Sequence, residues 1–154
     1  MSLPPSPADR TLVLTRLLAA PRSLVFQAWT QPGHLARWWG PAGFTLPTCE
    51  MDFRAGGAYR FCMRAPDGRD HWVWGVYREI VEPERLVFTW EREDEAGLRC
   101  QSSMVVTVTF AEQAGQTRLT LHQATFQTTA DCADHHRGWK ECLERLADWT
   151  TQAH

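Results

Sequence analysis

The length and composition of the chain exclude several classes of protein before any motif is considered. Its 154 residues are 44% hydrophobic and 22% charged, proportions typical of a single globular domain and not of a disordered chain. The formal net charge of -2, without a basic patch, argues against nucleic acid as a partner, because phosphate binding requires a basic excess. No apolar run reaches the roughly 18 residues that a membrane span requires.

The N-terminus and the cysteines indicate a cytoplasmic protein without a disulfide framework. Residues 1–9 contain three prolines and no basic residue, so we expect a flexible lead-in and no signal peptide, followed by one domain over residues 10–154. The cysteines are five in number and lack C-x-x-C spacing, which predicts small buried side chains. They are Cys49, Cys62, Cys100, Cys132 and Cys142.

The first part of the domain is predicted to be one strand followed by two short helices. Residues 10–18 are rich in Thr, Val and Leu, as strands are. Pro21 suits the first turn of a helix, and an apolar stripe continues through residues 24–29. A second short helix is expected over residues 34–39, because the Gly40-Pro41 pair that follows is a strong helix breaker.

The middle of the chain reads as strand and turn throughout. Alternating apolar and polar residues are separated by turns rich in glycine and proline, which predicts consecutive hairpins in a mostly antiparallel sheet. Gly75 interrupts the alternation of one run and predicts a β-bulge there, so the register around it stays open. The expected strands cover residues 44–53, 58–64, 70–81, 86–90, 104–110 and 117–126.

The clearest element is a C-terminal helix over Asp131–Gln152. Asp131 offers an N-cap oxygen, and Gly138 inside the helix costs about 1 kcal/mol relative to alanine, which predicts close approach of another backbone. Laying this helix across the sheet buries an apolar face of each, so the fold class is α+β. The apolar stripe consists of Trp139, Cys142, Leu143, Leu146 and Trp149.

The aromatic residues predict a cavity between the sheet and the C-terminal helix. Any one of them is also an ordinary core residue, but the chain contains eight tryptophans and a single isoleucine, whereas a dry core is built mainly from Leu, Ile and Val. The predicted ligand-binding residues are Trp39, Phe61, Met63, Trp72, Trp74, Phe88, Trp90, Val106, Val108, Leu121, Trp139 and Leu143.

Other local patterns allow two interpretations each. The segment Trp38-Trp39-Gly40-Pro41 is either a lid over the cavity or a pin that holds the short helix to the sheet. Asp52 and Arg54 share a strand face, as a structural ion pair or a catalytic carboxylate with its partner would. Several metal-capable groups share the first turns of the C-terminal helix, namely Asp131, Cys132, Asp134, His135 and His136. Cys132 and His136 have the spacing of helical zinc ligands, but no further ligands follow at a recognisable spacing, so we expect a solvated helix start and no metal.

No motif of nucleophilic, nucleotide or metal chemistry is present. The chain has no G-x-S-x-G elbow, P-loop or dinucleotide glycine pattern, so we expect no catalytic residue and no cofactor. Chemistry in the cavity would require a polar side chain that reaches into it. The candidates are Arg60, His71, Tyr77, Glu79 and Gln123.

Several segments, in chain order, resemble the Hsp90-ATPase-activator-like branch of the START/Bet v 1-like superfamily. They are residues 20–30, Trp38-Trp39-Gly40-Pro41, residues 52–57, Pro66-Asp67-Gly68, residues 79–86 and Gly138-Trp139. The resemblance extends over nearly the whole chain. It implies the helix-grip fold, in which a curved antiparallel sheet of six to seven strands wraps around a long C-terminal helix, with two short helices after the first strand.

The resemblance also implies a range of functions. Members of the superfamily are similar in holding lipids, polyketides or aromatic hormones between sheet and helix, and a minority are cyclases or hydrolases. The namesake domain helps to activate the chaperone Hsp90. We do not expect that role here, because the chain has no counterpart of the namesake's separate binding domain. A shared fold does not fix the activity.

Three functions therefore stay open, and the first is our main hypothesis. It is the binding of an apolar or aromatic small molecule in the cavity, without a cofactor. The second, a small-molecule enzyme, requires a polar residue deep in the cavity with a perturbed pKa. The third, a chaperone-associated domain or a homodimer module, requires a filled core and an exposed apolar patch.

Overall fold

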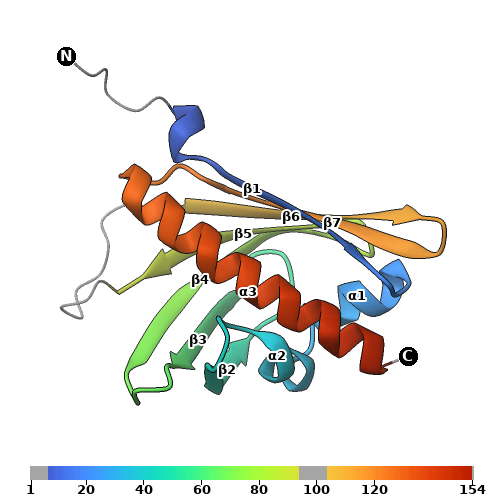
Figure 1. Ribbon diagram of the computed structural model, residues 1–154, viewed down its shortest axis with the longest axis horizontal. Helices are drawn as coiled ribbons and strands as arrows, with labels where there is room; N and C mark the ends of the chain where they lie inside the picture. Colours follow the sequence, from blue (N-terminus) through green and yellow to red (C-terminus); the bar gives the residue numbers. More distant parts are fainter. Residues whose placement is uncertain (1–6, 94–103, 154) are drawn as a thin grey trace.

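A curved antiparallel sheet wraps around one long helix in the computed structural model, which describes residues 7–93 and 104–153 (Figure 1). The elements are η1 (Pro7–Arg10), β1 (Leu12–Leu18), α1 (Arg22–Ala28), α2 (Pro32–Trp38), β2 (Thr45–Met51), β3 (Ala58–Arg64), β4 (Asp70–Val81), β5 (Arg85–Arg92), β6 (Met104–Gln113), β7 (Gln116–Ala124) and α3 (Thr129–Ala153). The predicted α+β class, with two short helices after the first strand, is confirmed. The expected lead-in falls mainly outside the described residues, and its last part belongs to η1.

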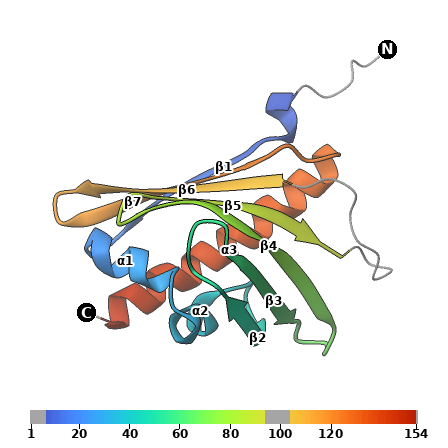
Figure 2. The same ribbon diagram turned by 180° about the vertical axis from the view of Figure 1, so that it is seen from behind.

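The strands follow one another through hairpins, with a single exception. The order in the sheet is β1-β7-β6-β5-β4-β3-β2, so β1 pairs with β7 at one edge and β2 forms the other edge. The connection from β1 to β2 carries α1 and α2, which lie beside the C-terminal half of α3 in both views (Figures 1 and 2). Neither short helix covers the N-terminal half of α3. The candidate site described below lies at this uncovered half of the helix.

Helix α3 begins slightly earlier than the sequence indicated. The side-chain oxygen of Thr128 accepts the backbone N–H of Asp131 at 3.0 Å, which makes Thr128 the N-cap. The prediction that Asp131 caps the helix is therefore wrong, and its carboxylate is free for other contacts. Although α3 has 25 residues, no helix in the described part of the chain is both long and apolar enough to cross a membrane.

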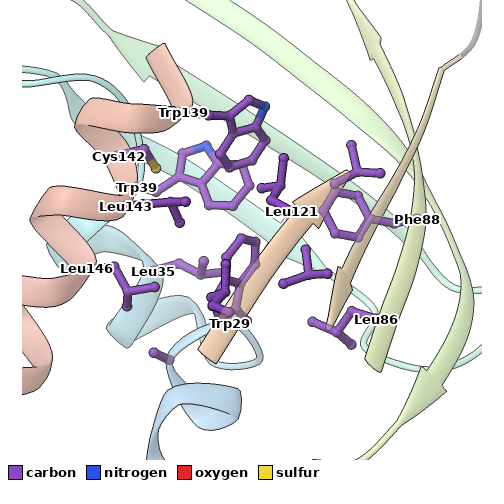
Figure 3. Packing of buried hydrophobic residues seen from close by; sticks show 14 of the residues in the cluster. Trp29, Leu35, Trp39, Leu86, Phe88, Leu121, Trp139, Cys142, Leu143 and Leu146 are labelled. Atoms are coloured by element: carbon purple, nitrogen blue, oxygen red, sulfur yellow. The ribbon is translucent and has the colours of Figure 1, made fainter. Parts of the chain in front are cut away.

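Tryptophan rings fill the centre of the molecule, where α1, α2 and α3 meet the sheet (Figure 3). The ring of Trp29 lies 4.8 Å from that of Trp38 and 5.9 Å from that of Trp39, centroid to centroid. It also stacks on Trp139 of α3 at 6.2 Å, with an interplanar angle of 22°. These contacts join both short helices to α3, and each such aromatic pair contributes about 0.5–1.5 kcal/mol beyond its buried area.

Strand β4 turns a different face to the core than the sequence suggested. Val73 and Tyr77 are buried, whereas Trp72 and Trp74 lie on the opposite face and are partly exposed. The guanidinium of Arg60 stacks 3.9 Å from the ring centroid of Trp72 on that outer face. The prediction that Trp72 and Trp74 point inward is therefore wrong. Alternation shows which residues share a face, but it does not show which face is covered.

Gly75 lies on the inner face of β4 for a reason other than a bulge. The register between β4 and β5 shifts between Tyr77 and Glu79, so the predicted bulge at Gly75 is wrong. A Cβ atom at Gly75 would lie 2.1 Å from the backbone oxygen of Thr89 in β5. The same oxygen accepts the hydroxyl of Tyr59 at 2.5 Å. Only glycine allows the two strands to come this close.

The described cysteines are free thiols. Cys62, Cys132 and Cys142 are buried and Cys49 is partly buried, in line with the expectation of small core residues. Cys100 lies outside the described residues.

Replacement of Gly75 by alanine tests the close approach of β4 and β5. We expect Gly75→Ala to lower the free energy of unfolding by about 2 kcal/mol, because the added methyl group must displace the backbone of the neighbouring strand. Gly33→Ala is the control, since a Cβ there meets nothing within 4 Å. Urea denaturation of both variants measures the difference, and equal stabilities would contradict the role of Gly75.

Candidate functional site

A cavity of about 470 Å³ lies between the N-terminal half of α3 and the ends of β3, β4 and β5. Its apolar wall comes from five elements or loops and includes Trp39, Pro41, Phe44, Met63, Val73, Trp90, Trp139 and Cys142. Its polar wall includes His71, Arg92, Glu93, Asp131, Asp134 and His135. The volume is within the usual range for small-molecule sites, about 300–1,000 Å³.

Three tryptophan rings form the core side of this cavity. The ring centroid of Trp139 lies 5.4 Å from that of Trp39, at an interplanar angle of 82°, and 5.3 Å from that of Trp90. The three residues are 3–5% exposed. Trp139 is held in place by Gln123, a fully buried residue of β7 whose Oε1 accepts the indole N–H at 2.8 Å. The apolar wall is therefore rigid on the side of the packed core.

The structure divides the predicted ligand-binding residues into four groups. Those that line the cavity are Trp39, Met63, Trp90 and Trp139, together with Trp72, which lies on the outer face of β4 but adds to the lining at the end of that strand. Phe61 and Phe88 border a void of about 10 Å³, which holds one water molecule at most. Trp74 lies on the outer face of β4. The remaining four are 0–3% exposed and belong to the packed core, namely Val106, Val108, Leu121 and Leu143.

The polar wall contains residues that the sequence analysis missed. Arg92 follows Leu86, Phe88 and Trp90 at the same spacing of two along β5, so extending that alternation by one step would have found it. His135 lies four residues before Trp139 on α3, and extending the helical stripe backwards would have included it. Arg92 was overlooked because a charged residue at an inward position looks like the end of the pattern. His135 was considered only as a metal-capable group and was assigned to a solvated helix start.

Arg92, Asp131 and His135 form one connected group at the polar wall. Nη2 of Arg92 donates to Oδ1 of Asp131 at 2.6 Å. Nδ1 of His135 lies 3.2 Å from the same carboxylate oxygen and 3.0 Å from the backbone oxygen of Asp131. The hydrogen bond from His135, followed by the positive charge and hydrogen bond of Arg92, holds the pKa of Asp131 below its usual range despite partial burial. Asp131 is therefore an ionised acceptor between two donors.

Two buried donors beside the cavity lack acceptors among the described residues. They are Nε1 of Trp90 and Nε of Arg92, neighbours on the same face of β5. A buried donor left without a partner costs about 1–3 kcal/mol. A third such donor, Nε1 of Trp29, lies in the packed core, so two of the three unpartnered buried donors in the described part of the chain lie beside the cavity.

The Trp38-Trp39-Gly40-Pro41 segment is fixed to α3 and is not a free lid. Nη1 of Arg145 lies 3.0–3.1 Å from the backbone oxygens of Trp39, Gly40 and Pro41. The N–H of Gly40 donates to Sγ of Cys142 at 3.3 Å. Pinning is thus the correct interpretation. The ring of Trp39 packs against Phe61 of β3 at 5.1 Å, as expected, and the backbone of the segment is also fastened to α3.

Cys142 has no nucleophilic role in this arrangement. Burial raises the pKa of its thiol to about 12, so the sulfur stays protonated at neutral pH, whereas the thiolate is the reactive form. Its sulfur instead accepts the Gly40 N–H. Cys142 is a structural part of the cavity wall.

Gly138 keeps the cavity open on the side of α3. The nearest atom to a Cβ placed there is Cγ of Pro41 at 3.6 Å, an ordinary contact with a side chain. The prediction that another backbone approaches Gly138 is therefore wrong. Because Gly138 lines the cavity, a larger side chain at this position would extend into it.

Of the polar residues considered for chemistry, only His71 reaches the cavity. Tyr77 lies on the inner face of β4, where burial raises its pKa. Arg60 lies on the outer face, and Glu79 pairs with Arg85.

Asp52 and Arg54 form an ion pair of 2.8 Å that is more than half exposed, as expected for a structural pair. Within the described ranges, no three His, Cys, Asp or Glu side chains are placed to share a metal ion.

Replacement of Arg145 tests the attachment of residues 39–41 to α3. We expect Arg145→Met to lower the free energy of unfolding by about 2 kcal/mol, because a charged donor is lost and backbone oxygens are left without it. Arg137→Met on the same helix removes only an exposed ion pair with Asp134 and should change stability by less than about 0.5 kcal/mol. Thermal or urea unfolding of both variants gives the comparison, and an equal effect would contradict the attachment.

Comparisons with known proteins agree with this architecture. A family model described as activator of Hsp90 ATPase homolog 1-like protein matches residues 19–150. The solved AHSA1 protein from Silicibacter pomeroyi has 26% identity and a TM-score of 0.84, covering 94% of this chain and 99% of that one. Protein CV1439 from Chromobacterium violaceum has 30% identity and a TM-score of 0.81, covering 92% and 96%. No curated protein matches the chain.

The matched segment extends from the end of β1 almost to the end of α3. The helix-grip fold and the place in the START/Bet v 1-like superfamily, both expected from the sequence, are confirmed. The chain belongs to the family of activator of Hsp90 ATPase homolog 1-like proteins.

Proposed function

We propose that the protein binds an apolar or aromatic small molecule in the cavity beside α3. The observation that carries this proposal is the cavity of about 470 Å³ with Trp39, Trp90 and Trp139 in its wall. An apolar ligand gains roughly 25 cal/mol for each Å² that it removes from water. Rigid rings already packed against each other lose little conformational freedom when a ligand arrives, which favours binding.

The enzyme alternative has less support from the geometry. It requires a polar group deep in the cavity with a perturbed pKa. Burial raises the pKa of Tyr59 and Tyr77, but both lie in the packed core and are absent from the cavity wall. Asp131 does line the cavity, but its lowered pKa keeps it ionised, and its Oδ1 already accepts from Arg92 and His135. The cysteine that does line the cavity is a protonated thiol. The arrangement therefore favours binding over catalysis.

The interaction-domain alternative also has less support. It requires a filled core and an exposed apolar patch. The large apolar side chains that are exposed in the described part of the chain belong to two separate strands, with Val13 and Leu17 on β1 and Val76 and Val81 on β4. The family takes its name from a chaperone activator, but the cavity with the aromatic wall lies between α3 and the sheet and is of small-molecule size. We therefore favour a small-molecule ligand over a protein partner.

Filling the cavity from α3 tests the proposed function. Tryptophan emission overlaps the absorption of naphthalene derivatives, so energy transfer reports binding of 2-methoxynaphthalene near the tryptophans. We expect Gly138→Leu to weaken this binding at least about tenfold, because the added side chain occupies the apolar volume. Removal of a helical glycine should leave the fold intact, since glycine is disfavoured within helices by about 1 kcal/mol.

Ala133→Leu is the matched control, because Ala133 is exposed on the same helix and does not line the cavity. It should bind 2-methoxynaphthalene as the unmodified protein does. Equal binding by Gly138→Leu would place the ligand elsewhere. If neither lipids nor aromatic compounds bind to the unmodified protein, the proposed function is wrong.

A further inference from the structure

The cavity has a polar end that a purely apolar ligand would leave without a partner. His135 lies there, and its side chain is only 12% exposed. Its ring packs against Phe126 at 4.9 Å and against Trp90 at 6.2 Å, centroid to centroid. The imidazole is therefore held in one place by its neighbours.

The contacts of His135 determine which of its nitrogens faces a ligand. Nδ1 lies 3.0 Å from the backbone oxygen of Asp131 and 3.2 Å from its carboxylate oxygen. Both oxygens can only accept, because the carboxylate is ionised, so the proton of the neutral ring is on Nδ1. Nε2 then presents a lone pair, and none of the described residues forms a hydrogen bond with it.

Arg92 fixes this tautomer from the other side. Its Nη2 holds the Asp131 carboxylate at 2.6 Å, and its Nη1 donates to the backbone oxygen of Glu93 at 3.2 Å. Asp131 is thus held in the position where it orients the imidazole, in the way that an outer carboxylate orients a histidine ligand. The group offers a ligand one preorganised acceptor, Nε2 of His135.

The charges around the cavity indicate whether the ligand is neutral or charged. Three carboxylates line the wall, those of Glu93, Asp131 and Asp134. Asp131 pairs with Arg92 and Asp134 with Arg137, so the carboxylate of Glu93 leaves the lining with a net negative charge. This excess of negative charge disfavours an anionic ligand such as a carboxylate. A neutral hydroxyl satisfies Nε2 without that repulsion.

We propose that the ligand is a neutral aromatic compound with a hydroxyl group, of the phenol or naphthol class. The hydroxyl donates its hydrogen to Nε2 of His135, and the ring lies among Trp39, Trp90 and Trp139. The proposal rests on the proposed function, because it specifies the ligand of the same cavity. It goes further by naming the group that is recognised and the residue that recognises it.

Three naphthalene derivatives test the inference. 2-Naphthol carries the hydroxyl, 2-methoxynaphthalene has the same ring and oxygen but no donor, and 2-naphthoate is an anion. We expect 2-naphthol to bind about tenfold more tightly than 2-methoxynaphthalene, as one hydrogen bond to a preorganised acceptor allows, and 2-naphthoate to bind most weakly. Energy transfer from tryptophan measures all three affinities.

Variants at two neighbouring positions of α3 test whether His135 causes the preference for 2-naphthol over 2-methoxynaphthalene. His135→Phe should abolish the preference for 2-naphthol and leave the affinity for 2-methoxynaphthalene within about twofold. His136→Phe is the matched control, because His136 is exposed and does not line the cavity, and it should keep the full preference. A preference that survives in His135→Phe would overturn the assignment.

A second measurement needs no variant. In protein containing ¹⁵N-labelled histidine, NMR identifies the protonated ring nitrogen and detects hydrogen bonding to Nε2. 2-Naphthol should shift the Nε2 resonance of His135 and 2-methoxynaphthalene should not. Equal affinity of the two compounds for the unmodified protein, or tightest binding of 2-naphthoate, would overturn the inference and leave the proposed function standing. Absence of binding by all three would contradict both.

Discussion

The packing of tryptophan rings between α3 and the two short helices is the contact on which the rest of the structure depends. Trp29 stacks on Trp139 and also contacts Trp39. Through these rings α1 and α2 are fixed at the C-terminal half of α3, and Arg145 then fastens the backbone of residues 39–41 to the same helix. Because the rings and short helices fill one end of the space inside the sheet, open volume is left only towards the other end.

The position of the cavity follows from two adjacent stripes on α3. The core stripe, with Trp139, Leu143 and Leu146, is large and apolar. The cavity stripe contains small or polar residues at helical spacing, namely Asp131, His135, Gly138 and Cys142. These side chains are too short or too polar to fill the space against β4 and β5. The same helix thus closes the core along one stripe and leaves a hollow along the next.

The sequence was sufficient for the architecture and insufficient for the site, for physical reasons. Turn residues and alternation located β3 and β4 with the bounds that the structure has. Alternation could not reveal that Gly75, flanked by the partly exposed Trp74 and the exposed Val76, lies on the buried face, because that depends on how closely β5 approaches. The polar group of Arg92 and His135 was missed because its members come from two elements whose pairing is set only by the three-dimensional fold.

The wall of the cavity contains features that reduce stability, and this cost is a reason to regard the cavity as functional. A glycine inside a helix and two buried donors without partners each oppose folding. Local departures of this kind are expected at functional sites, where the fold is not the only requirement on the sequence. Here they surround one volume, and a single neutral ligand with an aromatic body and a hydroxyl group would occupy the space beside Gly138 and give Nε2 of His135 its partner.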